Sequence, residues 1–134
     1  MLIYSGCDIS PKAVIGKNIS LPHPLGIVIG EKVTIGDNVK IWQHVTLGST
    51  GKMDEEFTYP VVGNNVRIFT GATIIGNVKI GDHATIGAHS LVLTDVPAGA
   101  TAIGSPAKLL KRKSHELIYT VPAVQNNFGA ENGC

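Results

Sequence analysis

Aliphatic residues recur at every sixth position along most of this chain, and this spacing is its strongest structural signal. The thirteen positions are all Ile, Leu or Val: Ile9, Ile15, Leu21, Ile29, Ile35, Ile41, Leu47, Val62, Ile68, Ile74, Ile80, Ile86 and Val92. A small or β-branched residue lies two positions before most of them. A period of six matches neither a helix face nor one long alternating strand. It predicts very short strands, each with two inward side chains, joined by two-residue corners.

Three such units close one triangular coil, and successive coils stack with strands about 4.8 Å apart. The fold class is therefore an all-β solenoid, a parallel β-helix of hexapeptide repeats. The register predicts four coils, with inward residues Ile9, Ile15 and Leu21; Ile29, Ile35 and Ile41; Leu47, Val62 and Ile68; and Ile74, Ile80 and Ile86. Glycine often follows the aliphatic residue, where we expect a turn that needs a permissive backbone, at Gly16, Gly30, Gly36, Gly48, Gly63, Gly81 and Gly87.

The repeat is interrupted twice, and both interruptions fall at corners of the predicted prism. Two extra residues lie between Leu21 and Ile29, within the sequence PHPL at residues 22–25. Fifteen positions separate Leu47 from Val62, which predicts an excursion near residues 49–59. Because loops that project from a rigid scaffold often carry function, we expect the chemistry of the chain at these interruptions.

The repeat ends near Val96, so we divide the chain after residue 106. Residues 1–106 are predicted to form the β-helix, and residues 107–134 a C-terminal cap and tail. The sequence AKLLKRK at residues 107–113 predicts a short amphipathic helix that covers the last coil. Such a cap is expected because an open ladder edge invites aggregation.

The composition of the chain argues against several classes of function. The chain has 134 residues, which suits one domain, and its 11 basic and 10 acidic residues give a net charge of +1. This balance argues against nucleic acid as a partner, since phosphate binding needs a concentrated basic face. No apolar run approaches the roughly 18 residues of a membrane span, and residues 1–6 do not resemble a signal peptide. With Cys7 and Cys134 far apart and Cys7 in an inward slot, we expect a reduced, cytoplasmic protein.

The predicted register brings three histidines to one edge of the prism. The corner after the third strand of each coil carries His23, His44, Gly71 and His89 in successive coils. Asp8 faces outward on the adjoining strand of the first coil, beneath Val28, near the point where His23 emerges. Two prolines flank His23 and stiffen its backbone, which favours a functional role. An isolated outward His is more often only a polar surface residue, and His83 lies on a different corner.

Three motifs are more specific than the repeat: HPLGIVIGE, VTLGSTGK and GSPAK. With the hexads around them they resemble the hexapeptide-repeat acyltransferase superfamily, in its serine O-acetyltransferase-like branch with short polysaccharide-modifying relatives. The resemblance implies a left-handed β-helix and a homotrimer with active sites between subunits. It also implies acetyl-CoA as co-substrate, no metal, and a short form without the N-terminal helical domain of true serine acetyltransferases.

The resemblance also implies roles for individual residues. The family's general base is a His in the short insertion, which corresponds to His23, and an Asp near the start of the β-helix, here Asp8, orients it. An imidazole takes up a proton near neutral pH, so it can activate a hydroxyl that attacks the thioester. A carboxylate at the other ring nitrogen fixes the tautomer. Backbone N–H groups of residues 48–51 would hold the oxyanion.

The remaining implied contacts concern CoA and the acceptor. We assign CoA binding to Gly48, Thr50, Gly51, Gly71, Ala72, Ala88, Lys108 and Lys111, with Arg112 as a further candidate for the phosphates. We assign acceptor binding to Tyr59 and His44.

Departures from the family pattern keep alternatives open. Tyr59-Pro60 stands where the family has His-Pro, Ser10 replaces a His after Asp8-Ile9, and Pro22 replaces the Asp before the catalytic His. The acceptor is therefore either L-serine, or a related hydroxyl compound, or a sugar hydroxyl in surface glycan synthesis. Two other classes are a non-catalytic trimeric scaffold and a metal enzyme like the gamma-type carbonic anhydrases. The last needs three converging histidines, whereas His44 and His89 are two coils, about 9.6 Å, apart.

Overall fold

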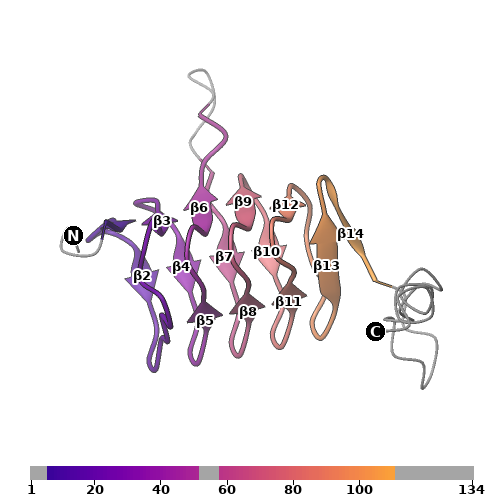
Figure 1. The fold of residues 1–134 in the computed structure, drawn as a ribbon, viewed down its shortest axis with the longest axis horizontal. Helices are drawn as coiled ribbons and strands as arrows, with labels where there is room; N and C mark the ends of the chain where they lie inside the picture. The colour runs from indigo at the N-terminus through magenta and orange to yellow at the C-terminus, as the bar shows by residue number, and fades with distance from the viewer. Residues whose placement is uncertain (1–5, 52–57, 111–134) are drawn as a thin grey trace, which may run out of the picture.

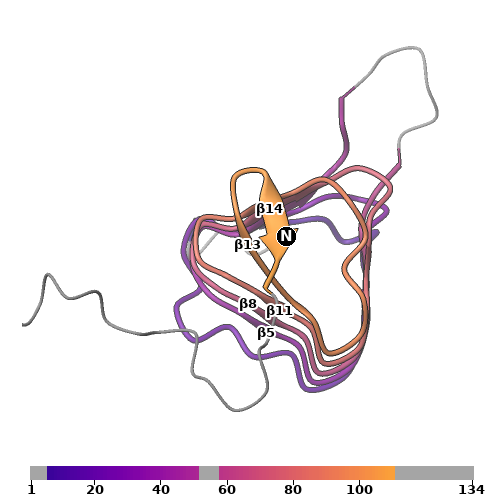
Figure 2. The same cartoon turned by 90° about the vertical axis from the view of Figure 1, so that its right-hand side faces the viewer.

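The structure is a computed structural model that describes residues 6–51 and 58–110. Within these residues the chain forms fourteen short strands, arranged in three sheets. The coils lie side by side along the long axis in Figure 1, and the view along that axis in Figure 2 shows their triangular outline. The three sheets are the faces of this prism, which is the predicted left-handed β-helix.

Each face consists of one strand from each successive coil. Sheet A has the order β1 (Asp8–Ile9), β3 (Val28–Ile29), β6 (Thr46–Gly48), β9 (Thr73–Ile75) and β12 (Leu91–Val92). Sheet B contains β2 (Val14–Ile15), β4 (Thr34–Ile35), β7 (Val61–Val62) and β10 (Lys79–Ile80). Sheet C contains β5 (Lys40–Ile41), β8 (Arg67–Ile68), β11 (Thr85–Ile86), β13 (Thr101–Gly104) and β14 (Ala107–Leu109).

The register of the coils is the predicted one. Ile9 pairs with Ile29, Ile29 with Leu47, and Leu47 with Ile74 on sheet A. Sheet B aligns Ile15, Ile35, Val62 and Ile80, and sheet C aligns Ile41, Ile68 and Ile86. A parallel bridge from Ser20 to Lys40 brings the end of the first coil into the same register. The hexad spacing therefore predicted which inward residues stack.

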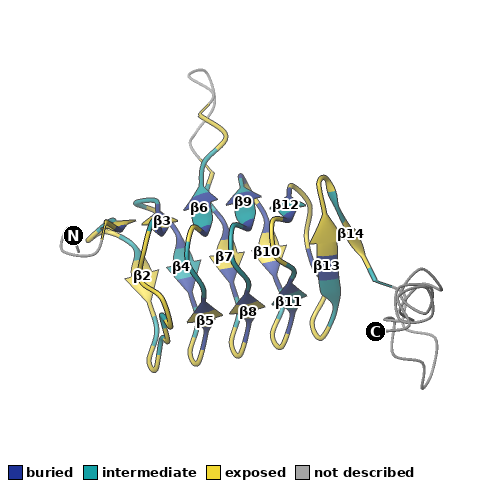
Figure 3. Cartoon of the chain, in the orientation of Figure 1, coloured by how far each residue is buried: buried dark blue, intermediate teal, exposed yellow. Residues whose placement is uncertain are grey.

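The core is a set of parallel columns of small aliphatic side chains. The fully buried ones include Val33, Ile35, Val39, Ile41, Val45, Leu47, Val66, Ile68, Ile74 and Ile86. Figure 3 shows burial alternating with exposure along the coils, because the residue between two inward ones points to solvent. Cys7 is buried in this core, as its slot predicts. Ile15 is 39% exposed, since β2 has a described neighbour, β4, on one side only.

The predicted C-terminal helix is wrong for residues 107–109. These residues form β14, which pairs antiparallel with β13 and extends sheet C at the end of the solenoid, as Figure 1 shows. The hairpin supplies the ladder edge of β13 with a partner strand, which a helix would not do. Residues 111–113 lie outside the described part. In that part, the chain has no helix of the length and apolarity that crossing a bilayer requires.

At two corners of the prism, each coil contributes one residue with a left-handed backbone conformation. The Asn corner, between sheets B and C, contains Asn18, Asn38, Asn65, His83 and Gly99. The His corner, between sheets C and A, contains Gly6, Gly26, His44, Gly71 and His89. Asn, His and Gly tolerate positive φ better than most residues, which explains the composition of both corners.

Among the glycines that follow the aliphatic residues, Gly16, Gly36 and Gly63 serve another purpose than the one we expected. None of the seven adopts positive φ. At the Asn corner the side-chain oxygen of the next coil fills their Cβ space: Asp37 Oδ1 at Gly16, Asn64 Oδ1 at Gly36 and Asp82 Oδ1 at Gly63. These oxygens accept hydrogen bonds from the amides of Lys17, Asp37 and Asn64 at 2.7–2.8 Å. Glycine is needed there for close approach between coils.

Candidate active site

His23 lies at the His corner, in the insertion between Ser20 and β3, and is exposed. Contrary to our expectation, Gly26 and not His23 holds the stacking position of this coil. The Gly26 amide donates to the Gly6 carbonyl at 3.1 Å, and the His44 amide donates to the Leu25 carbonyl at 2.9 Å. These bonds keep Leu25 and Gly26 in the stack. The two extra residues therefore lie among residues 22–24, and His23, in the middle of this segment, lies outside the stack.

Asp8 lies at the same corner, on the first strand of sheet A. It pairs with Val28 as predicted, and its carboxylate is exposed. Among the described residues, no hydrogen bond joins the Asp8 carboxylate to the His23 imidazole. The fold thus brings the predicted base and its orienting carboxylate to one corner without linking them in this single chain.

The described ends of the excursion, next to β6 and β7, leave the prism at the third corner, between sheets A and B (Figures 1 and 2). Its start, after Gly48, contains a local hydrogen bond in which the Gly51 amide donates to Ser49 Oγ at 3.3 Å. The Thr50 methyl lies 3.1 Å from the Cβ position of Gly76, one coil further along. At the other end, the half-buried Tyr59 ring fills the space over Gly30. The predicted Gly48, Thr50, Gly51 and Tyr59 are therefore grouped at this corner; residues 52–57 lie outside the described part.

Two of the histidines at the His corner, His44 and His89, cover the glycines beneath them. The Nδ1 of His44 takes the space that a Cβ on Gly26 would need, and Nδ1 of His89 does so at Gly71. At Gly71, which we assigned to CoA binding, the His89 imidazole occupies the space beside the glycine.

The other predicted CoA contacts divide into two groups. Ala88 and Lys108 are exposed and accessible to a ligand. The Ala72 side chain is fully buried in the core, its amide donates to Phe69, and its carbonyl accepts from Thr46. Its side chain is therefore not exposed to a ligand and its amide is bonded within the chain, and its assignment to CoA binding stays a prediction. Lys111 and Arg112 lie outside the described residues.

Sequence reasoning missed an aromatic pair on the outside of sheet C. Trp42 and Phe69 stack with ring centroids 4.4 Å apart, and Lys40 Nζ lies 5.3 Å from the Trp42 ring centroid. Both aromatic residues directly follow an inward Ile in the same column, so the hexad register would have paired them. Beside them, Gln43 Oε1 is buried without a hydrogen-bond partner in the described part of the chain. An unpaired buried acceptor is costly, which makes Gln43 a candidate for contact with a donor group.

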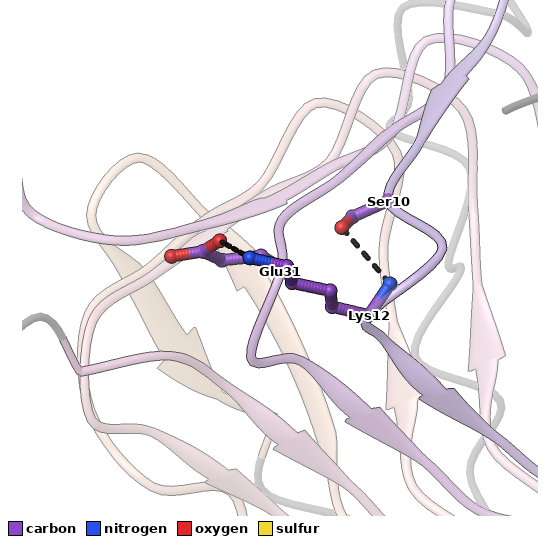
Figure 4. A network of polar contacts seen from close by, with 3 residues as sticks. All are labelled: Ser10, Lys12 and Glu31. Carbon is purple, nitrogen blue, oxygen red and sulfur yellow. Dashed lines mark hydrogen bonds and ion pairs between the residues drawn. The ribbon is translucent and has the colours of Figure 1, made fainter.

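Ser10, which replaces a family His, has a local structural role. Its Oγ accepts a hydrogen bond from the Lys12 amide at 3.2 Å, and Lys12 Nζ lies 3.6 Å from Glu31 Oε2 (Figure 4). Both charged side chains are well exposed, so this ion pair adds little stability. Ser10 belongs to the corner between sheets A and B, away from His23.

The described residues offer no cluster of three or more His, Cys, Asp or Glu side chains arranged to hold a metal ion.

Comparisons with known proteins address the family directly. Residues 59–94 match the family model described as bacterial transferase hexapeptide (six repeats). Serine acetyltransferase of Staphylococcus epidermidis is 45% identical over 114 residues, which cover 85% of this chain and 53% of that protein. Soybean serine acetyltransferase complexed with serine superposes with a TM-score of 0.75 and 51% identity, covering 78% of this chain and 43% of that one.

A serine acetyltransferase structure in complex with CoA gives a TM-score of 0.72 at 45% identity, covering 78% of this chain and 42% of that one. The match to the curated relative from Staphylococcus epidermidis covers 53% of that protein, so the chain spans about half of its length. None of these relatives is named for a sugar acceptor, so that alternative gains no support. The repeat and these likenesses together make the chain a hexapeptide-repeat protein and a homologue of the serine acetyltransferases over about half of their length.

Proposed function

We propose that this chain is an acetyl-CoA-dependent O-acetyltransferase that acetylates the hydroxyl of L-serine. The observation that carries the proposal is the 45% identity to a serine acetyltransferase across 85% of the chain. The relatives whose structures contain serine and CoA support both substrates. An exposed His23 at the corner that also carries Asp8 supplies the chemistry that such a reaction needs.

In the proposed reaction His23 acts as the general base and then as the general acid. Its imidazole takes the proton of the serine hydroxyl, whose oxygen attacks the carbonyl carbon of the acetyl thioester. The C–S bond then breaks, the ester remains on serine, and His23 returns the proton to the CoA thiolate. Asp8 is proposed to accept a hydrogen bond from the other ring nitrogen once substrates are bound, since catalytic hydrogen bonds often tighten only in the complex.

The proposed CoA contacts lie at the start of the excursion and toward the C-terminal end of the solenoid. Gly48, Thr50 and Gly51 at the start of the excursion remain candidates for the thioester end and the oxyanion. Ala88 and Lys108 are exposed, and Lys108 offers a positive charge to a phosphate. Lys111 stays a proposed phosphate contact by the family resemblance alone. We also place the protein in the cytoplasm, where a thiol such as Cys7 stays reduced.

The proposed assembly is a homotrimer with active sites between subunits. Apolar side chains near the insertion and on sheet B are exposed in the single chain, with Leu25 54%, Val14 64% and Val61 42% exposed. Contact with a second subunit would remove such surface from water. Sedimentation equilibrium is expected to give three times the chain mass at micromolar concentration. A monomer mass throughout the concentration series contradicts the shared-site assembly.

The function is tested by following CoA thiol release from acetyl-CoA with L-serine, homoserine and several sugars as acceptors. We expect turnover with L-serine and a loss of about a hundredfold or more in His23→Ala. The control is His83→Asn, which replaces another exposed histidine by the residue type of its own corner and is expected to keep full activity. A sugar as the preferred acceptor refutes L-serine. If the protein does not bind acetyl-CoA, the proposed acetyltransferase function is refuted, and the non-catalytic trimeric scaffold is the alternative that is left.

A further inference from the structure

From Gly26 onward the His corner alternates between glycine and histidine, and the alternation has a steric cause. His44 and His89 have φ of 58° and 56°, and the coil below each of them has glycine at the same position. Each imidazole leans over that glycine and fills the space of its missing Cβ. The two pairs, His44 over Gly26 and His89 over Gly71, have the same construction.

Only the first of these pairs touches the insertion. The His44 amide donates to the Leu25 carbonyl at 2.9 Å, and the Leu25 amide donates to the His23 carbonyl at 2.8 Å. Pro22 and Pro24 have no N–H group, so they add no backbone donor to this segment. The C-terminal end of the insertion is therefore held by His44 from one side and by the bond from Gly26 to Gly6 from the other.

We propose that His44 is a positioning residue for His23. Its imidazole packs on Gly26 and its amide holds Leu25, and together they fix the direction in which the insertion leaves the prism. Under the proposed function this sets the place of the base relative to the hydroxyl, where an error of about 1 Å costs as much as a hundredfold in rate. His44 then acts through the backbone of the insertion instead of by binding the acceptor, the role that we first assigned to it.

His89 provides a matched control within the same molecule. The His89 amide donates to the Thr70 carbonyl at 2.8 Å, and the His89 ring packs on Gly71. His44 makes the equivalent contacts with Leu25 and Gly26. The coil beneath it runs in unbroken register from Ile68 to Ile74 and carries no histidine. A general effect of removing a corner imidazole should appear equally at both sites.

The kinetic test compares His44→Gly with His89→Gly. Glycine accepts the positive φ and keeps the amide donor, so each variant loses only the imidazole. We expect His44→Gly to lower kcat about tenfold and to change KM for acetyl-CoA and L-serine less than twofold. His89→Gly is expected to stay within twofold in all three constants. Urea unfolding of both variants checks that each remains folded.

A second measurement decides the proposal without relying on catalysis. In protein labelled with ¹⁵N-histidine, the signal that disappears in His23→Ala identifies His23. This signal is expected to shift and broaden in His44→Gly and to stay unchanged in His89→Gly. An unchanged His23 signal in His44→Gly, or an equal change in His89→Gly, overturns the proposal. A rise in KM for L-serine with an unchanged His23 signal overturns it as well and makes His44 an acceptor contact.

Because the kinetic expectation rests on the proposed function, the two can fail separately. If the unsubstituted protein transfers acetyl to none of the acceptors, the proposed function fails, and the NMR comparison still decides whether His44 positions His23.

Discussion

The Asn corner and the His corner have the same backbone conformation but differ in how successive coils are joined. At the Asn corner a side-chain oxygen from each coil binds an amide of the coil below, at 2.7–2.8 Å in three successive steps. A further bond joins Asn18 Nδ2 to Asn38 Oδ1 at 3.2 Å. At the His corner, packing of imidazole on glycine takes the place of this ladder, and the insertion carrying His23 interrupts it.

The difference shows where a repeat protein tolerates irregularity. A ladder of side-chain bonds needs the same spacing in every coil, so two extra residues would break it at one step. At the His corner the side-chain bonds between coils are separate ones, from the Thr70 hydroxyl to the Gln43 carbonyl at 3.1 Å and from the Gly104 amide to Ser90 Oγ at 3.2 Å. Backbone bonds of Gly26 and His44 restore the stack after the insertion. One corner therefore contributes to stability, and the other offers the place for the proposed chemistry.

The largest change at the Asn corner is expected from Gly36→Ala. Its Cβ would lie 2.7 Å from the Gly63 carbonyl oxygen and 2.8 Å from the Gly63 carbonyl carbon, and would also meet Asn64 Oδ1. The backbone of the next coil can move away only by straining its own hydrogen bonds. We therefore expect a loss of about 1–3 kcal/mol in the free energy of unfolding, measured by urea denaturation.

Gly48→Ala is the control for that prediction. The nearest heavy atom to its Cβ is 3.6 Å away, at Ile75 Cδ1, so the unfolding free energy should change by less than about 0.5 kcal/mol. Equal losses in Gly36→Ala and Gly48→Ala would mean that close approach between coils is not the reason for glycine at the Asn corner.

The next effect concerns two exposed aspartates, one at each corner. Asp8→Asn is expected to lower kcat/KM about tenfold, about 1.4 kcal/mol, without changing the unfolding free energy, because an amide is a poorer partner for an imidazolium. Asp82→Asn should leave both quantities unchanged, since Asn64 makes the corresponding bond with its amide oxygen one coil below. Steady-state kinetics and urea unfolding of both variants test the pair; lost activity in Asp82→Asn would contradict the division between corners.

The smallest expected effect is that of Asp82→Ala. This change removes the acceptor of the Asn64 amide, a bond of 2.7 Å, and should cost about 0.5–1.5 kcal/mol of unfolding free energy with kcat unchanged. Thermal or urea unfolding measures it. Stability equal to that of Asp82→Asn would show that solvent replaces the bond and that the ladder adds no stability at this step.

The hexad pattern predicted the stacking register because each inward slot accepts only an aliphatic side chain. A shift by one residue would put Lys40 or Arg67 into the core in place of Ile41 or Ile68. The same reasoning placed Asp8 beside Val28 and Cys7 in the core. These features depend on local polarity and a fixed period, and both can be read along the chain.

The arrangement of the His corner could not be predicted from the polarity of its residues alone. Both His23 and Gly26 are compatible with an exposed corner, and spacing alone does not say which two residues are extra. The bonds from Gly26 to Gly6 and from His44 to Leu25 decide it, and they join residues some twenty positions apart. The pairing of His44 with Gly26 was equally hidden, because it depends on contact between coils.

The sequence by itself thus determined the solenoid, its register and the places where it is interrupted, since a period of six with aliphatic inward positions admits only one stack. Tertiary structure decided how the ends and corners are completed. Residues 107–109 suit a helix or a strand by pattern, and the open edge of β13 makes them a strand. Gly16, Gly36 and Gly63 are required by oxygens from the next coil, and the insertion's course is held from both neighbouring coils. Each of these outcomes is a non-local contact, which local pattern does not encode.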